Sequence, residues 1–216
     1  MSRRRASMAT AAVAVLFIEA ALAFSAPTGR AHDFDETRRF VLSVEEDRVE
    51  LLVAYEVRPG RAADALVARF DANHDGLATT ALERLARAQT IGPRIRHGVV
   101  LEIHAAPRGR GGELPLTLSR LEFPEPPDDA GRRGVAAVAL YTAALPRRPT
   151  AASPLHLTFR TRGARGEVSL EAQAVAAYRL TAAGVPSRPG DPVLGPLQVR
   201  RRMAVDLTVT AVSGPG

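Results

Sequence analysis

The hexapeptide at residues 71–76, Asp-Ala-Asn-His-Asp-Gly, carries an oxygen-bearing side chain at every second position and ends in glycine. Calcium in proteins takes about six to eight oxygen ligands, and one loop can supply them by alternating its side chains inward around a sharp glycine turn. Asp71, Asn73 and Asp75 match the first three ligand positions of such a loop. Gly76 matches the turn. The spacing therefore predicts a calcium loop of the EF-hand kind.

The second half of the loop follows the pattern less closely. Leu77 would offer its backbone carbonyl, and Thr79 would contribute directly or through a water. The last position, which normally carries a bidentate carboxylate, falls on Leu82, and Glu83 follows one residue later. Two outcomes are open: a helix that starts one residue late lets Glu83 close the site, whereas a Leu82 that points into the core leaves the ion weakly held. We expect a low-affinity calcium site formed by Asp71, Asn73, Asp75, Leu77, Thr79 and Glu83.

The alternative for residues 71–76 is a turn rich in Asp and Asn that binds no ion. No twin loop is visible elsewhere in the sequence, and Ala78 stands where a paired loop usually has a larger aliphatic residue. A calcium ion in a single loop would act as a structural staple and not as half of a cooperative sensor.

Histidine supports a different hypothesis, because imidazole suits copper, nickel and zinc. A chain cleaved after Ala31 would begin with His32, whose α-amine and imidazole can chelate one ion with help from one or two other histidines. No two histidines stand at a spacing that brings them together on one element, and we expect His104 and His156 to lie on solvated strand faces. The alternative function is therefore a periplasmic copper or nickel carrier. The histidines are His32, His74, His97, His104 and His156.

The usual signatures of catalysis and of nucleic-acid binding are missing from the sequence. It has no Gly-x-Ser-x-Gly elbow, no His-Glu-x-x-His helix, no lysine and no cysteine. The net charge is +6, but with only seven phenylalanines and three tyrosines there is no stacking platform beside a basic face. We expect a non-enzymatic module that binds an unknown protein partner and no nucleic acid; an enzyme with no recognisable motif is the second alternative.

Helical spacing of apolar residues places the loop between two helices. The first is expected over residues 61–70. Thr79 or Thr80 can cap the second, and Gly92 and Pro93 would stop it. The expected inward face of this second helix consists of Leu82, Leu85, Ala86 and Gln89.

Alternating apolar and polar residues predict strands in the rest of the chain. Residues 40–44 and 49–57 are expected to form a hairpin. Six further strand-like runs lie at residues 99–105, 114–123, 135–145, 155–162, 168–180 and 197–212. Roughly eight strands with regular turn signals predict a mainly β, sandwich-like domain with a helix-loop-helix excursion at about 61–92.

Residues 1–31 have the pattern of a secretory signal peptide, with arginines at the start, an apolar stretch and small residues near two candidate cleavage points, after Ala23 or after Ala31. We therefore expect residues 32–216 to form a single periplasmic or secreted domain with no membrane span after cleavage. With no cysteine, such a domain depends on its core or on a metal for stability.

A family resemblance rests on the leader, on the segment VELLVAYEVRPG, on the helix ending in ARFDANHDG, and on the β-rich remainder. Over residues 32–101 the chain resembles bacterial exported proteins with one EF-hand-like loop. It is similar to the periplasmic segment found with HupE/UreJ-type nickel permeases. The resemblance implies an exported β-rich domain with a calcium loop.

Overall fold

The computed structural model describes residues 36–75, 78–106, 109, 111–124, 128–129, 132–161, 166–183, 193–198 and 204–212. In these ranges the chain is mainly β-strand, with two helices and two large sheets. The predicted β-rich fold class is confirmed at this level. The expected signal peptide at 1–31, His32, Gly76 and Leu77 lie outside the described residues.

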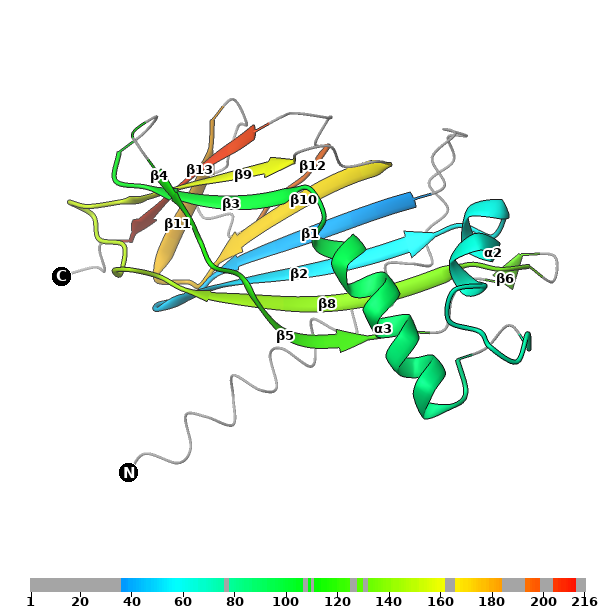
Figure 1. The fold of residues 1–216 in the computed structure, drawn as a ribbon. Helices are drawn as coiled ribbons and strands as arrows, with labels where there is room; N and C mark the ends of the chain where they lie inside the picture. The colour runs from blue at the N-terminus through cyan, green and yellow to red at the C-terminus, as the bar shows by residue number, and fades with distance from the viewer. Residues whose placement is uncertain are drawn as a thin grey trace. The chain divides into compact units, whose positions relative to one another are not determined.

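Six strands form the larger sheet: β1 (Glu36–Val44), β2 (Arg48–Val57), β5 (Thr117–Glu122), β8 (Val135–Ala144), β10 (Glu167–Ala174) and β12 (Val193–Gln198). Their order across the sheet is β12, β10, β1, β2, β8, β5, so β5 is an edge strand (Figure 1). β1 and β10 pair in parallel, and the other pairs are antiparallel. The predicted hairpin is confirmed as β1 and β2, with its alternating apolar residues buried.

Five strands form the second sheet: β3 (Val99–His104), β4 (Gly111–Glu113), β9 (Leu155–Thr161), β11 (Tyr178–Ala182) and β13 (Ala204–Ala211). Their order is β11, β13, β9, β3, β4, and every pair is antiparallel. The short strands β6 (Asp128–Asp129) and β7 (Arg132–Arg133) pair with each other.

Two of the predicted strands are each two strands in different sheets. The run 168–180 divides into β10 and β11 at a turn in which the Tyr178 amide donates to the Val175 carbonyl at 2.8 Å. The run 197–212 likewise spans β12 and β13. Both sheets contribute buried residues to one core. Apolar and polar residues therefore go on alternating where the chain passes from one sheet to the other, and the sequence pattern does not show where one strand ends and the next begins.

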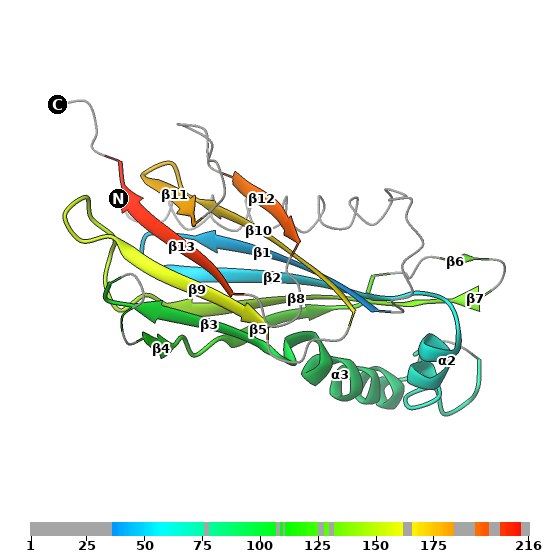
Figure 2. The same ribbon diagram turned by 90° about the horizontal axis from the view of Figure 1, so that it is seen from above.

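The two sheets share one hydrophobic core. Phe40 of β1 and Phe159 of β9 are fully buried, and their rings meet edge to face with centroids 5.1 Å apart. The strands β1 and β9 that carry these rings are labelled in Figure 2. Aromatic pairs prefer this geometry because the positive ring edge faces the negative ring face. Ile91 and Ile95 add a helix to the same core.

The two helices are α2 (Arg61–Val67) and α3 (Ala81–Arg96), and both pack on β8 (Figure 1). α2 ends three residues earlier than predicted, although Phe70 remains buried in the following turn. The predicted stop at Gly92 and Pro93 is wrong, since α3 continues to Arg96. Burial of Ile95 beyond the proline outweighs the hydrogen bond that proline removes. Neither helix has the length and hydropathy to cross a bilayer, considering the described residues alone.

The predicted inward face of α3 is also wrong. Leu82 is 79% exposed and Leu85 is 55% exposed, while Glu83, Ile91 and Ile95 are buried. Neighbouring residues on a helix differ by about 100° in direction, so turning Glu83 inward turns Leu82 outward. Bonds from the Thr79 and Thr80 amides to the Glu83 carboxylate hold this side chain inward.

Arg87 fastens α3 to its surroundings. Its guanidinium lies over the ring of Phe123, 4.3 Å from the centroid, and 5.7 Å from the centroid of Phe70. Nη2 donates to the Ala136 carbonyl at 3.4 Å. Burial lowers the pKa of Arg87, and its Nε has no hydrogen-bond partner. Stacking on two aromatic rings offsets part of this cost of desolvation.

The Arg87→Lys variant tests this role. Lysine keeps the charge but cannot stack as a planar fork, so we expect a loss of about 0.5 to 2 kcal/mol in the free energy of unfolding. Urea unfolding at constant pH measures it. Arg84→Lys is the matched control, because Arg84 is exposed and its Nη1 donates to the Thr79 carbonyl. Equal losses in the two variants would contradict the stacking role.

Candidate functional site

The predicted calcium loop begins where the turn after α2 ends. The Asp71 amide donates to the Val67 carbonyl at 3.0 Å, and this bond fixes where the Asp71 side chain starts. Asp71 is buried, with 6% of its surface exposed, whereas Asn73 and Asp75 are exposed. The first predicted ligand therefore lies inside the fold and the next two lie on its surface.

One backbone amide draws the first two predicted ligands together. The Asp75 amide donates to Asp71 Oδ1 at 3.2 Å and to Asn73 Oδ1 at 3.1 Å. Asn73 Nδ2 in turn donates to Asp75 Oδ2 at 2.9 Å. His74 has a φ of 60°, a left-handed conformation that bends the chain sharply between these residues. Asp71, Asn73 and Asp75 thus form one compact, hydrogen-bonded turn.

The second half of the segment is organised by a capping box at the start of α3. Thr80 is the N-cap: its Oγ1 accepts from the Glu83 amide at 3.2 Å. Glu83 Oε2 accepts from the amides of Thr80 at 2.9 Å and Thr79 at 3.1 Å. Such reciprocal bonds satisfy amides that the first turn of a helix leaves unpaired. Of the two open outcomes, an inward-pointing Leu82 is wrong, and Glu83 is the side chain turned toward the loop.

The carboxylate of Glu83 also reaches the first half of the loop. Glu83 is 3% exposed. Its pKa is lowered chiefly because the Thr80 backbone amide donates to the carboxylate; the amides of Asn73 and Thr79 act in the same direction, and burial opposes them. A contact with Asn73 on one side and with Thr79 and Thr80 on the other makes Glu83 a bridge across residues 71–83.

The acids in this segment do not form a ready-made cage. Over the ranges that the structure describes, no three His, Asp or Glu side chains lie close enough together to hold one metal ion. Any ion at this loop would therefore need neutral oxygens as well, from the Asn73 amide, the Thr79 hydroxyl or backbone carbonyls. Leu77, whose carbonyl was predicted to be one of these, lies outside the described residues.

Sequence reasoning missed a pair of histidines. Antiparallel pairing of β3 with β9 places His104 directly opposite His156. His104 Nδ1 lies 2.9 Å from the Gly109 carbonyl, which can only accept, so Nδ1 carries the proton. His104 Nε2 is then buried without a hydrogen-bond partner, 3.6 Å from Glu102 Oε2. His156 Nδ1 lies 3.1 Å from Thr208 Oγ1.

The expectation that these histidines lie on solvated faces is wrong for His104, which is only 9% exposed. The β3–β4 hairpin covers it: a Cβ at Gly111 would lie 2.3 Å from His104 Nδ1, so only glycine fits there. Burial lowers the pKa of His156, and the charges of Arg147 and His104 lower it further. His97 ends α3, ahead of β3, so the strand separates it from His104.

Acid titration of stability tests the bridge at Glu83. The pKa of Glu83 is lower in the folded protein than in the unfolded chain, so ionised Glu83 stabilises the fold at pH values above the ordinary carboxyl pKa. This stabilisation is lost as the pH falls through the lowered pKa of the folded state. Glu83→Gln should therefore be less stable than the parent at pH 7, and the difference should shrink in acid. Urea unfolding at pH 7 and near pH 3 measures it. Glu46→Gln, at an exposed position, should show no such convergence.

A scan of the chain against protein-family models finds no match, and a search of curated proteins finds no similar sequence.

Proposed function

We propose that residues 71–83 bind calcium with low affinity and that the ion serves as a structural staple between the turn after α2 and the start of α3. The observation that carries the proposal is the convergence of Asp71 Oδ1 and Asn73 Oδ1 on a single amide, that of Asp75. Two side-chain oxygens that share one donor lie on the same side of the loop, which is the arrangement an ion needs.

The charge of the segment supports the same proposal. Asp71, Asp75 and Glu83 bring three carboxylates into a stretch of thirteen residues, from 71 to 83, with no arginine among them. Asp71 and Glu83 are both buried, so their hydration is already limited in the folded chain. A divalent cation would relieve the repulsion between these acids, and Glu83 would exchange amide donors for the ion.

A staple at this place would act on the core. α3 enters the core through Ile91 and Ile95, and its first turn is held by Glu83. An ion bound by both Asp71 and Glu83 would hold the two ends of the segment between the helices together, and would so help to keep α3 packed on β8. We also propose that the chain is an exported, sandwich-like domain. The leader at 1–31 would deliver it to a compartment where calcium is plentiful.

The affinity is set by the missing ligand. Leu82 occupies the usual position of the bidentate carboxylate and points to solvent, so Glu83 must serve from one residue later. We expect a dissociation constant of about 10⁻⁴ to 10⁻³ M, the range of extracellular modules. An ion this weakly bound would be a stabiliser at ambient concentration and not a switch.

Thermal unfolding of the full chain in calcium tests the proposal. With a dissociation constant of about 0.5 mM, about 5 mM free calcium adds roughly 1.4 kcal/mol to the free energy of unfolding. This corresponds to a rise in Tm of about 3 to 6 °C. Asp71→Asn keeps the oxygen that accepts from the Asp75 amide but removes the charge, so it should fold and lose the rise.

The matched control is Asp64→Asn, which removes an exposed carboxylate from the neighbouring helix α2 and should keep the full response. Magnesium at the same concentration should give a smaller rise, since it demands a stricter octahedral geometry. The proposal fails if millimolar calcium leaves the Tm unchanged, or if Asp71→Asn responds as the parent does.

A transition-metal carrier is the second candidate, and the His104–His156 pair favours it. Nε2 of His104 is buried without a hydrogen-bond partner, and a neighbouring imidazole stands opposite this residue across the strands. Copper(II) prefers such nitrogen ligands. His32, with its α-amine, would complete the coordination if cleavage follows Ala31.

Calorimetric titration with copper(II) separates this candidate from the calcium loop. His156→Gln should weaken copper binding at least tenfold and leave the calcium response unchanged. His74→Gln is the control, because His74 is an exposed histidine away from the pair. Equal copper affinity in both variants would reject the carrier.

A further inference from the structure

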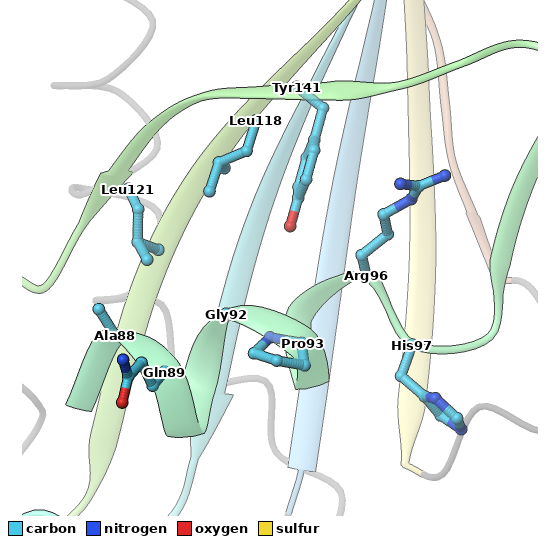
Figure 3. Close-up of a pocket in the computed structure, with 9 residues that line it drawn as sticks. All are labelled: Ala88, Gln89, Gly92, Pro93, Arg96, His97, Leu118, Leu121 and Tyr141. Atoms are coloured by element: carbon cyan, nitrogen blue, oxygen red, sulfur yellow. The ribbon is translucent and has the colours of Figure 1, made fainter. Parts of the chain in front are cut away.

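A groove of about 620 Å³ lies between α3 and the edge of the larger sheet (Figure 3). This volume falls in the range of roughly 300 to 1,000 Å³ found for small-molecule sites. α3 contributes one wall, and β5 and β8 contribute the other. The lining residues are Ala88, Gln89, Gly92, Pro93, Arg96, His97, Leu118, Leu121 and Tyr141.

The groove lies where α3, which packs on β8, passes beside the edge strand β5. Ile91 and Ile95 are fully buried, so this side of the helix is occupied by the core. Gly92 presents no side chain to β5: a Cβ there would still be 3.9 Å from Leu121 Cδ2. Leu118 is 45% exposed as a result. Leu118 therefore leaves an apolar side chain open to solvent beside an edge strand.

Tyr141 and Arg96 lie toward one end of the groove, whereas Gln89 lies beside Ala88 at the other (Figure 3). Tyr141 is 4% exposed, and in Figure 3 its hydroxyl points from β8 toward α3. Burial raises the pKa of Tyr141 and the Arg96 charge lowers it. Because burial is the larger effect, the phenol stays protonated and can donate a hydrogen bond. Arg96 and Tyr141 thus offer a cation and a donor at the same end.

Arg96 is held in place but not fully neutralised. Its Nη1 donates to the Leu116 carbonyl at 3.2 Å, and its Nη2 lies 3.4 Å from Glu113 Oε1. Both side chains of the Arg96–Glu113 pair are substantially exposed, at 39% and 53%. Exposed pairs of this kind contribute little to stability, so a ligand carboxylate can replace Glu113 at little cost.

We propose that this groove binds a free medium-chain fatty carboxylate, with its tail against Leu118, Leu121 and Pro93 and its carboxylate at Arg96 and Tyr141. The apolar lining favours a hydrocarbon tail, and the single cationic end favours one negative charge at its head. An arginine fork and a phenol hydroxyl together match the two oxygens of a carboxylate. A neutral hydrocarbon would gain nothing from Arg96, which would keep its contact with Glu113.

Calorimetric titration of the full chain with decanoate tests the proposal, with decanol and decyltrimethylammonium as neutral and cationic probes. All titrations run below the micelle concentration and in excess chelator, so that the result is independent of the calcium loop. We expect decanoate to bind at least tenfold more tightly than decanol, and the cation to bind more weakly than either.

Three variants locate the site. Arg96→Gln should weaken decanoate binding about tenfold and leave decanol binding unchanged, which removes the preference for the anion. Gly92→Leu should abolish binding of both by filling the groove, and leucine is a better helix former than glycine, so the fold should persist. Leu82→Ser is the matched control: it removes an exposed leucine of α3 about 15 Å along the helix from Gly92 and should change nothing.

Equal affinity for decanoate and decanol would overturn the proposal, as would decanoate binding that survives Gly92→Leu or disappears in Leu82→Ser. If Gly92→Leu fails to fold, Leu118→Asp is used in its place. An aspartate at this exposed strand position should exclude the tail and repel the anion. Decanoate binding that persists in folded Leu118→Asp would also overturn the proposal.

Discussion

The reciprocal bonds between Thr80 and Glu83 hold the first turn of α3, and both the predicted calcium loop and the groove depend on how this helix is turned. Glu83, Ile91 and Ile95 are the buried residues of α3, and the two isoleucines, four residues apart, share one face of the helix. A leucine at the start of the same helix then faces water, at a cost that the buried isoleucines and the satisfied amides offset. The first-turn cap and the buried isoleucines thus both keep Leu82 on the solvent side of α3.

This rotation explains why part of the sequence prediction failed. Leu82, Leu85 and Ala86 fit a helical apolar stripe, and hydrophobicity alone favoured them over Glu83 as the inward face. Capping geometry was the competing signal: Thr-x-x-Glu at residues 80–83 is a capping box, and it fixes the helix start locally. The β1–β2 hairpin was predictable because its period of two and its turn residues agree, and no competing local signal exists there.

The long-range pairing of strands that forms the histidine pair could not be predicted from a single sequence. His104 and His156 are far apart in the chain, and they meet because β3 and β9 pair in an antiparallel register. A shift of that register by one residue would put one of them on the other face of the sheet. The calcium-loop ligands, by contrast, are close in sequence, so local spacing was enough to identify Asp71, Asn73 and Asp75.

The same rotation of α3 links the loop to the groove. Glu83 belongs to the inward face and Gly92 lies where the helix meets β5, so a helix turned to bury Leu82 would direct different residues at Leu121. The two sites nevertheless differ in what they require. The loop depends on oxygen atoms within one short segment, whereas the groove depends on how a helix seats against an edge strand. A staple that holds the start of α3 would therefore affect the groove only through the position of the helix, and not through any shared ligand.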